Sequence, residues 1–442
     1  MKPNLLLVMV DQLSGWALSR YGSTCVDTPH IDAIGREGAT FRQFFTNSAL
    51  CTPSRGCFMT GRYPHAHGAY ANGLRLGDDE VTLAHLLARA GYDTGYIGKW
   101  HLAGEPRPGW MEPEQAMGFA DTRFMFNRGH WKSLLEDESG QVKVSGEIGD
   151  ERTYTTDWLT AKAIDYVRQP RERPFFLMLS IPDPHDPYTV REPYASMYDP
   201  AAMEVPPTFA AGDRPAAVDS GGKSDIRGVW SERRLQETKA AYCGEVKCID
   251  DNVGKLMQAL REAGLLDGTI VVFTSDHGEY MGEHGLMHKN NVYETAYRVP
   301  LLVRWPAAIR PGTEVERLVA AVDVMPTLAG LIGVAPCGRE QGKDASPLLR
   351  GELTEWIDEV FLHQDSQRKF GVFTPGFELV YADRSGGVLF DRLADPKQLF
   401  NRIDRPSYRE HVVRLTGALV RHGERAGCPE LNWLKEQLSH DD

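Results

Sequence analysis

The sequence predicts an α/β protein with a large parallel sheet, followed by a small C-terminal domain of a different kind. Two observations lead to this prediction. Apolar runs that end in polar residues recur four times along the first part of the chain, and helical patterns lie between them. After about residue 340, short strand patterns alternate with turns rich in Gly, Pro and Asp, which is typical of an antiparallel sheet.

Each of the four runs is typical of a strand that is buried on both faces. We expect these strands at Leu5–Val10, Asp93–Ile97, Pro174–Ile181 and Thr269–Phe273. The residues that follow them are polar: Asp11-Gln12, Gly98-Lys99-Trp100-His101, Pro182-Asp183-Pro184-His185-Asp186 and Thr274-Ser275-Asp276-His277-Gly278. Because ligands bind beyond the carboxyl ends of parallel strands, we expect the functional site at that edge of the sheet.

Helical patterns separate the strands, and the last hundred residues form their own set of short elements. The expected helices are Pro29–Glu37, Thr82–Ala90, Asp157–Arg168 and Ser231–Ala263. The expected late elements are strands at Glu359–His363, Gly371–Thr374, Glu378–Ala382 and Gly387–Phe390, then a helix at Tyr408–His422. We therefore expect a catalytic α/β domain at 1–340 and a small α+β domain at 341–442.

Composition and charge narrow the class of protein. The 442 residues are 42% hydrophobic and 25% charged, which suits a large globular core and excludes disordered and fibrous proteins. The 61 acidic and 49 basic residues give a net charge of −12, which argues against a nucleic-acid partner. An anionic ligand therefore requires a local cluster of cations.

The cysteines and the N-terminus bear on the compartment. Seven cysteines are too few for a disulfide scaffold, and their odd number leaves at least one thiol unpaired. The apolar run Leu5–Val10 is too short for a signal peptide or a membrane span. If the chain begins at its native start, we expect a cytoplasmic protein with no membrane partner.

The segment Cys51-Thr52-Pro53-Ser54-Arg55, followed by Gly61-Arg62, is the strongest local pattern. Pro53 suits the first position of a helix and Gly61 suits its end. Cys51 is therefore expected at a helix N-terminus, where backbone N–H groups favour an anion. From composition alone, an ordinary buried thiol explains Cys51 equally well.

Side chains at the strand ends could hold a divalent cation. Asp11, Asp276 and His277 follow separate strands, and Gln12 adds a carboxamide oxygen. Carboxylate and amide oxygens are the ligands that hard cations prefer. The alternative is that both aspartates only cap strand ends.

The Cys-x-Pro-Ser-Arg pattern at residues 51–55 matches the motif of the type I, formylglycine-dependent sulfatases, and the chain resembles that family over nearly its whole length. The resemblance implies the fold of the alkaline phosphatase-like superfamily, with a large, mostly parallel mixed sheet flanked by helices. It also implies that a formylglycine-generating enzyme oxidises Cys51 to Cα-formylglycine. Arg55 belongs to the motif which that enzyme recognises, and the hydrated aldehyde is the nucleophile.

The resemblance further implies a calcium site made by Asp11, Gln12, the formylglycine from Cys51, Asp276 and His277. Many sulfatases have Asp where this chain has Gln12, and Asn where it has His277. Both replacements occur in the wider superfamily, including its phosphonate monoester hydrolases. A cage with one carboxylate fewer and an imidazole more also suits Mn²⁺ or Mg²⁺.

Substrate-binding residues follow from the same resemblance. Lys99 and Lys289 match lysines that bind sulfate oxygens, and His185 matches a histidine that faces the substrate. His101 matches a histidine that contacts the formylglycine hydroxyl and would act as a base. Lys99 and His101 can face one direction if the backbone there stays extended. Asn72 is a weaker candidate for a further contact with the substrate.

In the implied mechanism, the hydrated formylglycine attacks sulfur, and His185 or Lys289 protonates the leaving oxygen. His101 then deprotonates the second hydroxyl, so that sulfate leaves and the aldehyde re-forms. Arg55 stabilises the formylglycine and the metal-binding carboxylates. The expected activity is hydrolysis of a sulfated carbohydrate or of a small aryl or alkyl sulfate.

Two alternatives remain open. A phosphonate monoester or phosphodiester hydrolase suits Gln12 and His277, but Lys99 and His101 argue against it. A catalytically silent protein that binds anionic glycans predicts an eroded motif, whereas the motif residues are all present. The alcohol of the substrate depends on variable segments such as 104–131 and the loop 199–223, and the sequence leaves it open together with the oligomeric state.

Overall fold

An eight-stranded mixed sheet forms the centre of the computed structural model, which describes residues 2–105, 109–210, 224–352, 354–383 and 386–439. Its strand order is β10-β2-β9-β8-β1-β7-β3-β4. Only β9 runs antiparallel to its neighbours in this sheet. The strands are β1 (Asn4–Val10), β2 (Ala39–Phe45), β3 (Asp93–Lys99), β4 (Asp121–Phe126), β7 (Phe175–Ile181), β8 (Thr269–Ser275), β9 (Leu301–Arg304) and β10 (Thr313–Ala320).

The four strands expected from the sequence are β1, β3, β7 and β8, and they lie together in the sheet. Their continuous apolar runs reflect burial on both faces. In β1, Leu5, Leu7 and Met9 belong to the core on one face of the sheet. The alternate residues Leu6, Val8 and Val10 belong to the core on the other face.

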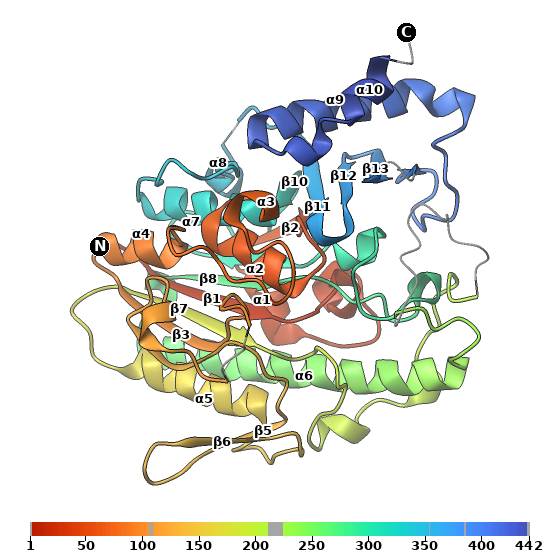
Figure 1. The fold of residues 1–442 in the computed structure, drawn as a ribbon. Coiled ribbons are helices and arrows are strands. Elements are labelled where there is room, and N and C mark those ends of the chain that lie inside the picture. Colours follow the sequence, from red (N-terminus) through yellow and green to blue (C-terminus); the bar gives the residue numbers. More distant parts are fainter. Residues whose placement is uncertain (1, 106–108, 211–223, 353, 384–385, 440–442) are drawn as a thin grey trace.

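Helices cover both faces of this sheet (Figure 1). On one face α1 (Pro29–Arg36), α5 (Thr155–Arg168) and α6 (Glu232–Glu262) pack together. On the other face lie α2 (Cys51–Thr60), α3 (Pro64–His67), α4 (Leu83–Arg89), α7 (Val324–Ile332) and α8 (Ser346–Arg350). A hairpin of β5 (Ser133–Glu136) and β6 (Val142–Ser145) projects beside α5.

The C-terminal part is a four-stranded antiparallel sheet followed by a helix, as expected, and by a second, short helix that the sequence did not predict. Its elements are β11 (Val360–Gln364), β12 (Lys369–Phe373), β13 (Phe377–Ala382), β14 (Gly387–Asp391), α9 (Arg409–Ala426) and α10 (Leu434–Ser439). This sheet lies on the side of α2 and α3 in Figure 1, and it shares one continuous core with them. The domain boundary near residue 340 stays a prediction.

Two features of the fold bear on expectations from the sequence. Of the loop expected at 199–223, residues 199–210 include a short 3-10 helix at Pro200–Ala202, and residues 211–223 lie outside the described part of the chain. Within the described residues, none of the helices is both long and apolar enough to cross a membrane.

Candidate active site

The polar residues after β1, β3 and β8 converge at the carboxyl edge of the central sheet, where the sequence predicted a site. Asp11 and Gln12 follow β1, Lys99 ends β3, and Asp276 and His277 follow β8. All five are fully buried. Because the strand order places β8, β1, β7 and β3 side by side, these residues approach one another although they are far apart in sequence.

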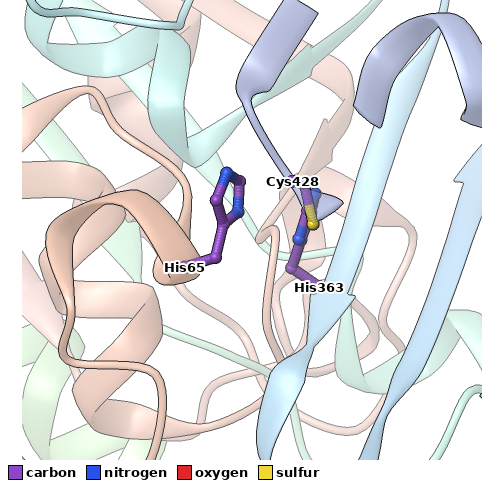
Figure 2. Close-up of side chains that lie close together, drawn as sticks. All are labelled: His65, His363 and Cys428. Atoms are coloured by element: carbon purple, nitrogen blue, oxygen red, sulfur yellow. The ribbon is translucent and has the colours of Figure 1, made fainter. Parts of the chain in front are cut away.

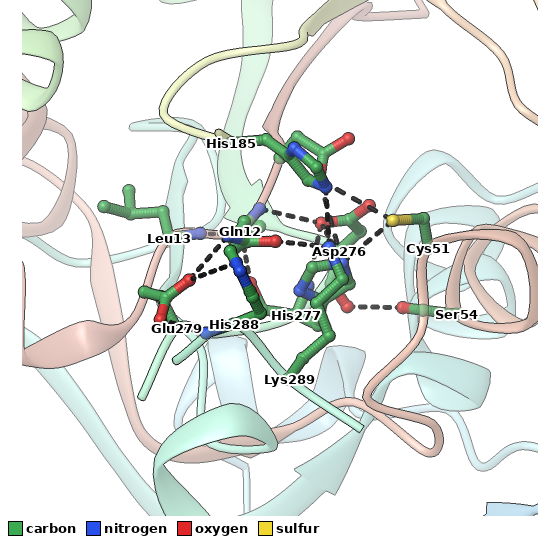
Figure 3. Close-up of polar contacts among 12 residues, drawn as sticks. Gln12, Leu13, Cys51, Ser54, His185, Asp276, His277, Glu279, His288 and Lys289 are labelled. Carbon is green, nitrogen blue, oxygen red and sulfur yellow. Dashed lines mark hydrogen bonds and ion pairs between the residues drawn. The ribbon is translucent and has the colours of Figure 1, made fainter. Parts of the chain in front are cut away.

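Cys51 is the first residue of α2, and it lies against this edge (Figure 3). The helix begins two residues earlier than predicted, so Pro53 occupies its third position and not its first. Proline is tolerated there because the first N–H groups of a helix have no intrahelical partner. Gly61 ends the helix as expected, with a φ of 66°.

Asn72 contacts the start of the same helix. The backbone N–H of Thr52 donates a hydrogen bond of 3.0 Å to Asn72 Oδ1. The Asn72 side chain therefore satisfies one of the unpaired donors in the first turn, next to Cys51. Its predicted contact with a substrate stays a prediction.

Four side chains could hold a cation here: Asp11, Cys51, Asp276 and His277 each offer a ligand atom, and these atoms lie within 4.8 Å of one another. His277 Nδ1 lies 3.0 Å from the Gly278 carbonyl, which accepts its proton, so Nε2 is the nitrogen that faces the cluster. That Nε2 is 3.1 Å from Cys51 Sγ and 3.7 Å from an oxygen of each aspartate. The donor set of two carboxylates and one imidazole fits a divalent cation.

Gln12 is placed differently from the other predicted ligands. Its side-chain oxygen accepts a hydrogen bond from Lys289, and its Nε2 donates to Glu279 at 2.5 Å and to Tyr188 at 3.2 Å. Its backbone N–H donates to Asp276 Oδ1 at 3.1 Å. Gln12 therefore supports Asp276 and Lys289 in this structure, and its role as a metal ligand stays a prediction.

Arg55 holds the two aspartates in place. Its Nε donates to Asp276 Oδ2 at 2.9 Å and its Nη2 to Asp11 Oδ2 at 3.2 Å. Its Nη1 donates to the Lys99 carbonyl and to Ser180 Oγ. The rigid guanidinium fork thus ties α2 to the ends of β1, β3, β7 and β8, which a lysine could not do.

Lys99 and Lys289 approach Cys51 from two sides. Lys99 forms an ion pair with Asp11, and Lys289 donates to His185 Nε2 at 2.7 Å. Gly98 allows Lys99 this position, because a Cβ on Gly98 would lie 1.9 Å from the Ser180 carbonyl oxygen. Burial alone would raise the pKa of Asp11, but the neighbouring cations, Lys99 foremost, hold that pKa well below its usual value.

His185 and His130 stack on each other with their ring centroids 4.0 Å apart. Burial, and then the charge of Lys289, lowers the pKa of His185 well below its usual value, so the ring is neutral at neutral pH. His130 Nε2 lies 3.2 Å from Lys99 Nζ. His130 lies in the variable segment 104–131, and no sequence pattern marks it as a site residue. The tertiary structure shows that it belongs to the site.

His101 is buried beside α2, where its carbonyl accepts a hydrogen bond of 2.9 Å from Thr52 Oγ1. The backbone does not stay extended after Lys99, the condition for Lys99 and His101 to face one direction, because His101 has a φ of 62°, in the left-handed region. The turn arises where the chain leaves β3 and pairs with residue 127, since His101 N–H donates to the Asn127 carbonyl. The catalytic role of His101 stays a prediction.

Sequence reasoning missed two further members of the site, Glu279 and Tyr188. Glu279 Oε2 accepts hydrogen bonds from Gln12 and, at 2.7 Å, from the Tyr188 hydroxyl. Glu279 lies only two residues after His277, and this proximity was the available signal. Tyr188 carried no such signal.

Buried cations and carboxylates lie together around Cys51. Arg55 and Lys99 pair with the carboxylates of Asp11 and Asp276, while Gln12 bonds to both Lys289 and Glu279. Burial and Asp11 raise the pKa of the Cys51 thiol, but Lys289, Lys99 and His277 outweigh them and lower it. The arrangement therefore favours an anion beside residue 51, and a divalent cation would strengthen that preference.

Comparison with known proteins agrees with this geometry. The sulfatase family model matches residues 3–334, and the C-terminal model of N-sulphoglucosamine sulphohydrolase matches residues 282–425. The chain is 26% identical to the N-acetylglucosamine-6-O-sulfatase of Bacteroides thetaiotaomicron, over 94% of this chain and 85% of the relative. It is 29% identical to the arylsulfatase of Clostridium perfringens, over 98% and 97% of the two chains.

Solved structures show the same fold. A protein in complex with its substrate D-glucosamine-2-N,6-O-disulfate superposes with a TM-score of 0.84 and 24% identity, over 97% of this chain and 99% of the other. The phosphonate monoester hydrolase of Agrobacterium radiobacter superposes with a TM-score of 0.80 and 24% identity, over 96% of each chain. The chain belongs to the sulfatase family. It is a sulfuric ester hydrolase.

Proposed function

We propose that the protein hydrolyses a sulfate monoester of a carbohydrate, with residue 51 as the nucleophile after oxidation of Cys51 to formylglycine. One observation carries the proposal: Cys51 begins α2 at the carboxyl edge of the sheet, within a buried cluster where Arg55 and Lys99 pair with Asp11 and Asp276 and Lys289 lies beside Gln12. The name of the N-acetylglucosamine-6-O-sulfatase relative supports a carbohydrate, while that of the arylsulfatase relative keeps aryl sulfates as a second substrate class.

The donor atoms of Asp11, Asp276 and His277 fit a divalent cation, and we propose calcium, with Mn²⁺ and Mg²⁺ as the other candidates. When bound, the cation would supply a positive charge that stabilises the oxyanions of the substrate and of residue 51. Arg55 forms ion pairs with both carboxylates and fixes their orientation. The modified residue 51 would supply a hydroxyl for attack on sulfur.

Lys99 and Lys289 are placed to hold the oxygens of the sulfate group. Attack on sulfur breaks the bond to the leaving oxygen, and that oxygen must then take up a proton. His185 is neutral and its Nε2 accepts a hydrogen bond from Lys289. Burial lowers the pKa of Lys289, but the negative charges of Cys51, Asp11 and Asp276 outweigh burial and raise it. We therefore assign the proton of the leaving alcohol to Lys289, and we assign its orientation to His185.

Two other functions were weighed against this one. The phosphonate monoester hydrolase shares the fold at 24% identity, which does not identify the chemistry. A silent glycan-binding protein would not need the buried network of Arg55, Asp11 and Asp276 around the start of α2. The two lysines next to Cys51 favour the sulfatase.

Mass spectrometry of the peptide that contains Cys51 tests the maturation step. Protein from cells that hold a formylglycine-generating enzyme, the partner that we propose for maturation, should carry the aldehyde at residue 51. Hydrolysis of an aryl sulfate should fall by a factor on the order of 10⁴ or more in Cys51→Ala. The matched control is Cys337→Ala, a half-buried thiol after α7, which should keep full activity. Full activity in Cys51→Ala would identify another nucleophile.

A panel of substrates tests the substrate class. Sulfated mono- and disaccharides, choline sulfate, aryl sulfates and phenyl phosphonate are compared with matured protein. We expect the highest kcat/KM on a sulfated sugar, and a preference for the phosphonate would overturn the proposal. The cytoplasmic location stays a prediction, which fractionation of the native cells would test.

A further inference from the structure

A second cluster of metal-binding side chains lies outside the active site, between the catalytic region and the C-terminal sheet. Figure 2 shows the imidazole of His65 facing the His363 ring and the sulfur of Cys428. One ligand atom from each of the three lies within 4.8 Å of the others. His65 belongs to α3, His363 to β11, and Cys428 follows α9, so three distant segments meet here.

The hydrogen bonds of the two histidines leave one nitrogen of each ring available. His65 Nε2 lies 3.0 Å from the Ala426 carbonyl, which accepts its proton. His363 Nε2 lies 2.7 Å from His422 Nε2. The Nδ1 atoms of both rings are buried and have no hydrogen-bond partner among the described residues. This is the arrangement of metal-binding histidines, which donate one N–H to a neighbour and present the other nitrogen to the ion.

A carboxylate lies beside His363, next to the cluster. Both oxygens of Asp365 are buried without a hydrogen-bond partner in the described part of the chain, and Oδ2 lies 3.9 Å from His363 Nδ1. Unsatisfied buried polar atoms are costly, so several of them in one place call for a partner that the side chains do not provide. A cation would satisfy the carboxylate and both imidazoles at once.

We propose that His65, His363 and Cys428 bind a structural zinc ion, and that Asp365, which lies outside this group beside His363, moves in as the fourth ligand. Two imidazole nitrogens, a thiolate and a carboxylate are a donor set that suits tetrahedral Zn²⁺ better than calcium or magnesium. Zinc bonds of about 2.0–2.3 Å place neighbouring ligand atoms about 3.3–3.8 Å apart, so the side chains must close by about 1 Å. Binding releases the thiol proton of Cys428 to solvent.

The site would fasten the C-terminal segments to the catalytic region. The helix α3 follows α2, which carries Cys51, after only three residues. Gln341 already links the same segments, since its Nε2 donates to the Ala426 carbonyl and its Oε1 accepts from the Tyr63 N–H. Zinc that binds the folded chain but not the unfolded one would raise the unfolding temperature.

The test uses full-length Cys51→Ser protein, because that substitution removes the thiol of the active-site cluster. After treatment with a chelator, the protein is loaded with Co²⁺ or Zn²⁺. We expect a thiolate-to-cobalt charge-transfer band, one zinc ion held through gel filtration beyond any at the active site, and a higher unfolding temperature. Cys51→Ser/Cys428→Ser should lose the band, the extra zinc ion and the thermal shift. Cys51→Ser/Cys337→Ser, the matched control, should keep all three.

Two results would overturn the proposal: a cobalt–thiolate band that persists without Cys428, or no such band in Cys51→Ser protein. If the Cys428 variant does not fold, X-ray absorption of zinc-loaded Cys51→Ser protein identifies the ligand atoms of the zinc ion instead. A sulfur atom in the zinc shell is expected there, and a shell of nitrogen and oxygen alone would contradict the site. His65→Gln, on the half-buried α3, should also lose the extra zinc ion.

Discussion

Two clusters of buried charge lie near the carboxyl edge of the sheet, and they differ in how many cations pair with their carboxylates. Around Cys51, Arg55 and Lys99 pair with Asp11 and Asp276, and Lys289 and Glu279 both bond to Gln12. Next to it, the single cation Lys132 bridges two carboxylates, those of Asp183 and Glu245, at 2.7 Å each. The first cluster is suited to receive an anion, whereas the second has an excess of negative charge.

Groups within the protein compensate the excess negative charge of the second cluster. Burial, against the opposing charge of Lys132, raises the pKa of Glu245 to about 8. Asp183 stays fully bonded, since its Oδ2 accepts from the Tyr154 and Thr156 hydroxyls. Asp183 precedes His185 by two residues, so this cluster supports the loop that carries a catalytic candidate. The buried charge of the second cluster therefore supports this loop.

Removal of the central cation of the second cluster should have the largest effect on stability. Lys132→Met leaves the Asp183 carboxylate buried without its cation, next to Glu245, so we expect the free energy of unfolding to fall by about 3–5 kcal/mol. Chemical denaturation measures this. Lys143→Met, on the exposed face of β6, is the control and should change stability by no more than about 1 kcal/mol. An unchanged unfolding free energy in Lys132→Met would contradict the structural role.

Lys99→Met should instead affect catalysis. Asp11 keeps its ion pair with Arg55, so the fold loses less than it does without Lys132. The lost charge next to the sulfate should lower kcat/KM by about 10²–10³. Steady-state kinetics on an aryl sulfate provide the measurement, with Lys162→Met on α5 as a control of equal charge change. If kcat/KM fell equally in Lys99→Met and Lys162→Met, the result would contradict a role for Lys99 in catalysis.

Glu245→Gln should change how stability depends on pH. The folded-state pKa of about 8 lies above the ordinary value of 4.5, so the native state binds an extra proton between these values and wild-type stability falls as pH rises. The slope is at most about 1.4 kcal/mol per pH unit. Glu245→Gln has no carboxyl to titrate at this position. The difference in unfolding free energy, variant minus wild type, should therefore increase from about pH 5 to about pH 8. Denaturation at both ends measures the difference, and a constant difference would contradict the raised pKa.

His130→Phe should have the smallest effect. Phenylalanine keeps an aromatic ring over His185 but removes the nitrogen that lies 3.2 Å from Lys99 Nζ. The loss of one such hydrogen bond is worth about 1 kcal/mol, so kcat/KM should fall about fivefold. His130→Ala, which also loses the stacking, should be worse. Equal kinetics in wild type and both variants would show that His130 does not position Lys99 or His185.

Much of the fold was readable from local patterns, and the misses have physical causes. The strands β1, β3, β7 and β8 were predicted because strands buried on both faces are apolar throughout. The edge strand β10 was missed because Glu314, Glu316 and Arg317 interrupt its apolar residues on the exposed side. The strand β9 has only four residues.

The sequence by itself determined that a helix begins near Cys51 and that Asp11, Lys99 and Asp276 come at strand ends, because helix signals and strand burial are local properties. Only the tertiary structure decided which of these residues touch. The strand order brings β8 next to β1, and that order depends on packing between segments hundreds of residues apart. The contacts of His130 with Lys99 and of His65 with His363 arise in the same way, so no local pattern could predict them.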